Sequence, residues 1–138
     1  MATYLDWKNQ NLSLEIVPHK RFKTQLTIKI KAEAPEILDT FCDALKGVYL
    51  ELEGDGGELR LELPHRWDLF WKLRESGSRA LLAHPESEQW VGTLALDGDF
   101  GRRLLSALKN LRNGESLKLS TLGSLEYMSN LEIEFCLG

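Results

Sequence analysis

The segment LTIKIKAEAPEILDTFCDALKG, residues 26–47, contains a strand pattern followed directly by a helix pattern. In its first part, leucine and isoleucine alternate with polar residues, and this period of two predicts a strand with one buried face. From Pro35 onward, the apolar residues recur at helical spacing and share an arc of about 160° on a helical wheel. Pro35 suits the first helical position, and Gly47 suits the C-cap. The segment therefore predicts a strand followed by a helix.

Similar patterns recur along the chain and define its expected fold. Further strands are predicted near residues 4–8, 12–16, 50–52, 59–63, 80–83, 90–96, 117–119 and 131–137. Further helices are predicted over Pro64–Ser76, with Gly77 as cap, and from Asp97 or Asp99 to Gly114. We expect one α+β domain over residues 1–138, an antiparallel sheet of about seven or eight strands with three helices packed on it. Its element order is ββ-α-ββ-α-ββ-α-ββ, which reads as an α-β-β unit used three times.

Composition narrows the function classes. The 138 residues are 43% hydrophobic and 28% charged, with a formal net charge of −4. This negative charge weighs against generic binding to nucleic acid or anionic membrane, where cations are needed. The basic stretch at residues 19–23, with Lys29 and Lys31, is more typical of solvent-facing strand lysines than of a nucleic-acid groove. Without an apolar run of roughly 18–20 residues or a signal-peptide pattern, we expect no membrane association and a cytosolic location.

No motif predicts catalysis, a metal or a cofactor. Asp99-Phe100-Gly101 resembles a kinase tripeptide only by chance and is better explained as a helix start. The glycine-rich residues 54–57 predict a hairpin turn, and the histidines lack metal-ligand spacing. Cys42 and Cys136 are expected to be buried free thiols, because a secreted domain would usually carry more cysteines. Burial is expected to raise the pKa of the Cys42 thiol and make it inert.

The segment Pro64–Ser76 provides the one candidate site. In WDLFWKL, residues 67–73, five of seven residues are apolar, and on a helical wheel they cover about 200°. A helix lying on one sheet needs an apolar stripe of roughly 100°, so part of this surface would remain free. Tryptophan and arginine are enriched at binding hot spots. The predicted protein-binding residues are Arg66, Trp67, Trp71 and Arg74.

The best interpretation is a small non-catalytic protein-binding module that uses this helix or an exposed strand edge. Its partner is either another protein or a second copy of the chain. Two alternatives stay open, a small-molecule-binding domain and an enzyme with dispersed catalytic residues. The first hypothesis predicts an exposed apolar patch at Trp67 or Trp71. The second predicts a closed polar-lined pocket, and the third predicts a cleft containing perturbed pKa values.

Overall fold

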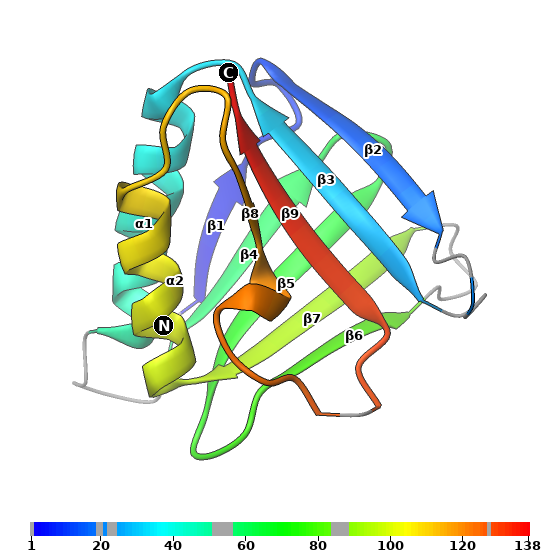
Figure 1. Cartoon of the computed structure of the whole chain (residues 1–138), viewed down its shortest axis with the longest axis vertical. Helices are drawn as coiled ribbons and strands as arrows, with labels where there is room; N and C mark the ends of the chain where they lie inside the picture. The colour runs from blue at the N-terminus through cyan, green and yellow to red at the C-terminus, as the bar shows by residue number, and fades with distance from the viewer. Residues whose placement is uncertain (1, 19–20, 22–24, 51–56, 84–88, 127) are drawn as a thin grey trace.

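The structure is a computed structural model that describes residues 2–18, 21, 25–50, 57–83, 89–126 and 128–138 (Figure 1). Within these ranges the chain forms nine strands, two α-helices and one 3₁₀ turn. Their bounds are β1 Ala2–Asp6, β2 Leu12–Pro18, β3 Leu26–Ala32, α1 Pro35–Tyr49, β4 Glu58–Leu63, β5 Trp67–Arg74, β6 Arg79–Ala83, β7 Trp90–Asp97, α2 Gly98–Lys109, β8 Ser116–Lys118, η1 Leu119–Thr121 and β9 Leu131–Leu137. Most of the predicted glycine turn at 54–57 and most of the basic stretch at 19–23 lie outside the described residues.

The strands form two sheets, so the prediction of a single antiparallel sheet is wrong. Sheet A has the strand order β1-β4-β5-β7-β6, and sheet B has the order β2-β3-β9-β8. Three neighbouring pairs are parallel, β1 with β4, β3 with β9 and β5 with β7. Hairpins were predicted correctly as local units, but their side-by-side arrangement depends on contacts between distant parts of the chain. The fold remains α+β, with mixed sheets.

The predicted helix over Pro64–Ser76 is also wrong, because most of this segment is strand β5. Its residues pair with β4 on one side and with β7 on the other. Trp67, Leu69 and Trp71 point to the buried side with a period of two. Phe70 lies on the opposite side, and this apolar residue at a polar position broadened the apparent helical arc. The described residues contain two α-helices in place of the three predicted.

The chain consists of two similar halves that exchange hairpins. The first half contains β2, β3, α1, β4 and β5, and the second contains β6, β7, α2, β8 and β9. Leu26 and Trp90 are 64 residues apart, and so are Trp67 and Leu131. The register pairs Leu26 with Leu131 in sheet B and Trp67 with Trp90 in sheet A. One shift therefore relates the central strand pairs of both sheets, and each sheet contains a hairpin from each half.

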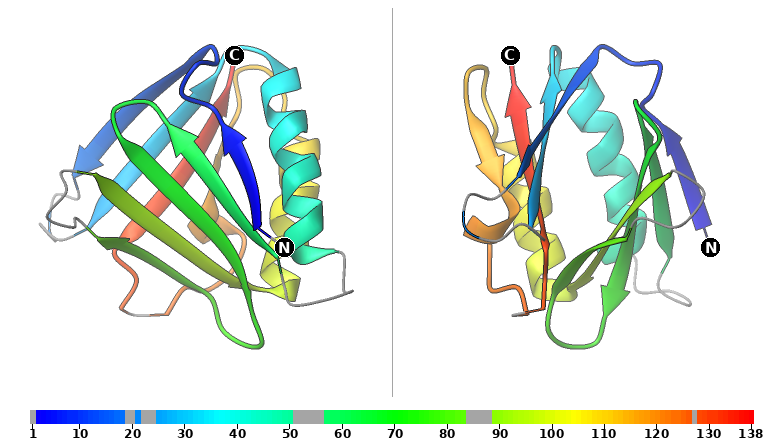
Figure 2. Two further views of the ribbon diagram at one scale, coloured as in Figure 1. Left: turned by 180° about the vertical axis from the view of Figure 1, so that it is seen from behind. Right: turned by 90° about the vertical axis from the view of Figure 1, so that its right-hand side faces the viewer.

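The core lies between the two sheets, which face each other with both helices along one side (Figure 2). Phe41 of α1 is fully buried at its centre. Its ring centroid lies 4.9 Å from Trp7, 5.3 Å from Trp71 of sheet A and 5.5 Å from Phe135 of sheet B. Aromatic pairs at such separations add stabilisation beyond the area they bury. Helix α1 therefore joins the two sheets through one side chain.

Both helices begin as the sequence predicts and end elsewhere. Pro35 starts α1, and the Asp97 carboxylate accepts a 2.9 Å hydrogen bond from the Phe100 N–H at the start of α2. Helix α1 continues past Gly47 to Tyr49, because nothing at Gly47 requires a left-handed backbone. Helix α2 ends at Lys109, before Gly114. Neither helix has the length and apolar character of a membrane-spanning helix.

Candidate binding surface on the outer face of sheet A

The four predicted binding residues do not form a common surface. Trp71 is fully buried and Trp67 is 5% exposed, so the apolar patch expected at these tryptophans is absent from the surface. Trp67 stacks on Trp90 with ring centroids 5.1 Å apart. Arg66 precedes β5 in the turn from β4, with a φ of 62°. Arg74 lies at the other end of β5, where its guanidinium pairs with Glu126 at 2.9 Å.

An apolar and aromatic row crosses the outer face of sheet A instead. The strand registers place one residue from each strand side by side, in the order Tyr4, Arg60, Phe70, Thr93 and Leu81. We call these five residues the outer row of sheet A. Tyr4 is 52% exposed, and Phe70, Thr93 and Leu81 are half-buried. No described helix covers this face, because both helices lie on the inner side (Figure 2).

The corresponding row of sheet B has a different chemistry. The 64-residue shift carries Phe70 onto Glu134 and Lys29 onto Thr93, and the strand registers extend this row to both edges. The outer row of sheet B is Lys118, Glu134, Lys29 and Glu15, matching Arg60, Phe70, Thr93 and Leu81 of sheet A. Its charges alternate in sign, and the Lys29 Nζ lies 3.6 Å from Glu134 Oε2. The fold therefore accommodates charged side chains at these positions.

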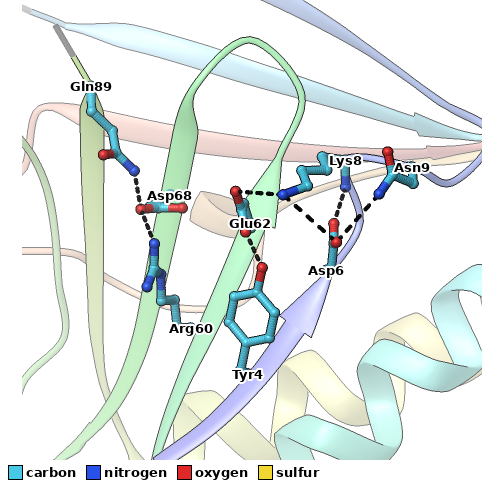
Figure 3. A network of polar contacts seen from close by, with 8 residues as sticks. All are labelled: Tyr4, Asp6, Lys8, Asn9, Arg60, Glu62, Asp68 and Gln89. Atoms are coloured by element: carbon cyan, nitrogen blue, oxygen red, sulfur yellow. Dashed lines mark hydrogen bonds and ion pairs between the residues drawn. The ribbon is translucent and has the colours of Figure 1, made fainter.

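A polar network beside the outer row of sheet A holds Tyr4 (Figure 3). The Tyr4 hydroxyl donates a hydrogen bond to Glu62 Oε2, and Lys8 Nζ lies 3.2 Å from Glu62 Oε1. These contacts, the Tyr4 bond foremost, lower the pKa of Glu62 below its ordinary value. The same hydrogen bond raises the pKa of Tyr4. The ring of Tyr4 is thus oriented by an ionised carboxylate on the neighbouring strand.

A second part of this network holds Arg60 and contains a buried carboxylate. Asp68 lies opposite Glu62 in the register and is only 3% exposed. Its Oδ2 accepts hydrogen bonds from Arg60 Nη2 at 3.0 Å and from Gln89 Nε2. Among the described residues, Asp68 Oδ1 has no hydrogen-bond partner. The guanidinium of Arg60 also lies 5.6 Å from the ring centroid of Tyr4, a cation–π distance.

Together the row and the network have the layout of a protein interface. Interfaces commonly combine an apolar centre rich in aromatic residues and arginine with a polar rim. Here Phe70, Thr93 and Leu81 form the apolar part, and the carboxylates of Asp6, Glu62 and Asp68 form the rim. Hydrogen bonds restrain Tyr4 and Arg60 before any partner arrives, which lowers the entropy cost of binding.

Other regions of the described chain fit small-molecule binding or catalysis less well. A hollow of about 570 Å³ opens to solvent beside the start of α2 and is lined partly by Asp97, Asp99 and Arg102. It is not the closed pocket that the small-molecule hypothesis predicted. No group of three or more metal-ligating side chains is found in the residues that the structure describes.

The cysteines agree with the expected inert thiols. Cys42 is 4% exposed, and burial raises the pKa of its thiol to about 11. Burial also raises the pKa of Cys136, which is half-buried on the outer face of sheet B. A thiol that is protonated at neutral pH is a poor nucleophile. The prediction for Cys42 is confirmed, whereas Cys136 is less buried than expected.

Comparison with known proteins follows from this geometry. No family model, curated protein or solved structure matches the chain. The contrast between the two outer rows is therefore the main functional observation, and the sequence prediction missed it. Its signal was Phe70, an apolar residue at a polar position of an alternating segment.

Proposed function

We propose that this protein is a non-catalytic protein-binding module that docks a partner protein on the outer row of sheet A. The observation that carries the proposal is the contrast between matched positions. Phe70, Thr93 and Leu81 stand where sheet B has Glu134, Lys29 and Glu15. The fold does not require apolar residues at these positions, so we attribute them to binding. We also propose a cytosolic location, which the free thiols of Cys42 and Cys136 support.

The residue types in the row support protein docking in particular. Tyrosine and arginine are enriched at hot spots, and Tyr4 and Arg60 are held in fixed positions by Glu62 and Asp68. Phe70 lies on a central strand, so its position is set by pairing on both sides. A partner that covers Phe70 removes apolar surface from water, which contributes roughly 25 cal/mol per Å² before the costs of association.

The test exchanges the two rows. The double variant Phe70→Glu with Thr93→Lys introduces into sheet A the residues that sheet B carries at the matched positions. We expect this variant to fold, because the same charge pair is accommodated in sheet B. A photo-crosslinking amino acid at position 70 should capture a partner in cells, and position 134 serves as the matched site. The captured protein is then identified by mass spectrometry and its affinity measured with purified components.

Binding should weaken roughly ten-fold or more in the double variant, as for substitution of hot-spot residues. The reverse exchange on sheet B, Lys29→Thr, should leave the affinity unchanged. The proposal is wrong if position 70 captures nothing beyond what position 134 captures. It is equally wrong if the double variant binds the identified partner as tightly as the original protein.

A further inference from the structure

Strand β2 forms one edge of sheet B, and its backbone groups alternate between β3 and the free side. The N–H of Glu33 donates to the carbonyl of Asn11, which identifies residues 11 and 33 as a hydrogen-bonded pair. In an antiparallel ladder such pairs recur every second residue. The odd-numbered residues of β2 therefore bond to β3, and Leu14 and Ile16 direct their N–H and C=O groups to the free side.

The matching edge of sheet A is closed by a loop. Strand β6, the counterpart of β2, donates its Ala80 N–H to Ser129 Oγ at 3.0 Å and its Leu82 N–H to Asn130 Oδ1 at 2.7 Å. The Asn130 N–H in turn donates to the Ala80 carbonyl at 3.0 Å. Side chains and backbone of the loop thus replace a missing strand. Among the described residues, no such bonds reach Leu14 or Ile16.

β2 also lacks other features that protect an edge strand. It is seven residues long and pairs with β3 without a bulge, in continuous register. It contains no lysine, and Ile16 is 36% exposed. Natural sheets usually protect such an edge with charge, a bulge, a covering loop or short length. By comparison, β8, the other edge of sheet B, has only three residues. These properties indicate that β2 can accept an added strand.

The charges of sheet B distinguish between the two candidate occupants of this edge. From β8 to β2 the outer row reads Lys118, Glu134, Lys29 and Glu15, so the signs alternate and the row ends with a carboxylate at the free edge. A second copy paired along the full length of β2 would place Glu15 opposite Glu15, and like charges directly opposite are destabilising. A lysine or arginine on the added strand would continue the alternation.

We propose that β2 binds an extended basic segment of a partner protein as a fifth, antiparallel strand of sheet B. Its central lysine or arginine lies opposite Glu15, and apolar residues on either side lie opposite Leu14 and Ile16. Backbone hydrogen bonds supply affinity in this mode of recognition, and alternate side chains supply specificity. Strand β3 carries the same pattern in Ile28-Lys29-Ile30 against the other edge of β2. This surface is separate from the outer row of sheet A.

The probe is a capped synthetic peptide with the β3 sequence LTIKIKA, and the control peptide is LTIEIEA. Titration into isotope-labelled protein should shift the backbone amide signals of Leu14 and Ile16 and slow their hydrogen exchange. The lysine peptide should bind roughly five-fold more tightly than the glutamate peptide, the scale of a favourable against an unfavourable cross-strand pair. Absence of these shifts at millimolar lysine peptide, or equal binding of both peptides, overturns the proposal.

Two protein variants make the test specific. Ile16→Pro removes an amide that faces away from β3, so sheet B should remain folded while peptide binding is lost. Glu15→Lys should reverse the preference, so that LTIEIEA becomes the tighter peptide. The double variant Phe70→Glu with Thr93→Lys should bind LTIKIKA normally, which separates this proposal from the one for sheet A. A dimer in sedimentation equilibrium that Ile16→Pro dissociates would identify a second copy as the occupant and overturn the proposal.

Discussion

Phe70 and Glu134 occupy equivalent positions, each on a central strand in the middle of an outer row. Phe70 pairs with Thr93 across the parallel junction of sheet A, and Glu134 pairs with Lys29 across the parallel junction of sheet B. The backbone surroundings are alike, whereas one side chain is aromatic and the other is charged. Backbone geometry cannot account for this difference. Each row can therefore be changed with the other as its control.

The first prediction concerns the aromatic centre of the core. Phe41→Ala should lower the free energy of unfolding by about 3–5 kcal/mol, because the side chain fills space between both sheets. Denaturant unfolding followed by tryptophan fluorescence measures this change. Tyr4→Ala, on the exposed row, should cost about 0.5–1 kcal/mol. Similar costs for both variants would contradict the position of Phe41 at the junction of Trp7, Trp71 and Phe135.

A second prediction compares two helical glycines. A Cβ added at Gly101 would collide with the ring of Tyr49, which is buried and donates a hydrogen bond to the Lys72 carbonyl at 2.9 Å. Gly101→Ala should therefore destabilise the protein by about 1–3 kcal/mol through overpacking. At Gly47 an added Cβ meets nothing within 4 Å, so Gly47→Ala should stabilise by about 0.5–1 kcal/mol. Thermal unfolding of both variants tests this, and shifts of the same sign would contradict it.

A third prediction concerns the pH dependence of the loop that closes β6. Hydrogen bonds from Arg79 and Arg74 hold the pKa of Glu126 below its ordinary value of 4.5. Because the folded-state pKa is the lower one, the stabilisation is fully present above pH 4.5 and disappears as the pH falls through the folded-state pKa. Glu126→Gln should therefore reduce stability near neutral pH and have a smaller effect at pH 3. Urea unfolding across this range measures it, and a pH-independent difference would argue against the ion pairs.

A fourth prediction concerns thiol reactivity. At pH 8 the Cys42 thiol, with a pKa of about 11 and 4% exposure, should react slowly with an alkylating reagent. Cys136 is less buried and should be labelled first. Mass spectrometry of partly labelled protein gives the order, and labelling in denaturant should make both rates similar. Faster labelling of Cys42 in the native protein would be inconsistent with its burial on α1.

A fifth prediction concerns the exchange of hairpins between halves. A fragment ending at Ser76 and a fragment starting at Gly77 should remain unfolded separately, because each sheet needs strands from both halves. Mixed together, they should regain dispersed amide signals in a nuclear magnetic resonance spectrum. A fragment that folds alone would contradict the mutual dependence of the halves.

Local patterns in the sequence predicted most strands and both real helices, because alternation and helical spacing depend on near neighbours. Strand order was not predictable in this way, since β5 meets β7 and β3 meets β9 only after a helix or a hairpin intervenes. Phe70 caused the main error, because an apolar residue on the outer side of a strand resembles part of a wide helical arc. The outer row of sheet A was missed for the same reason, as its members come from five separate strands.

The 64-residue relationship has a consequence for how this surface can evolve. Two identical half-length chains assembled in the same way would carry identical outer rows, and every substitution would appear on both sides at once. Joining the halves in one chain removes that constraint. One sheet can keep a charged, well-hydrated face that favours solubility while the other accumulates apolar contacts. In this protein a symmetric framework supports two chemically independent faces.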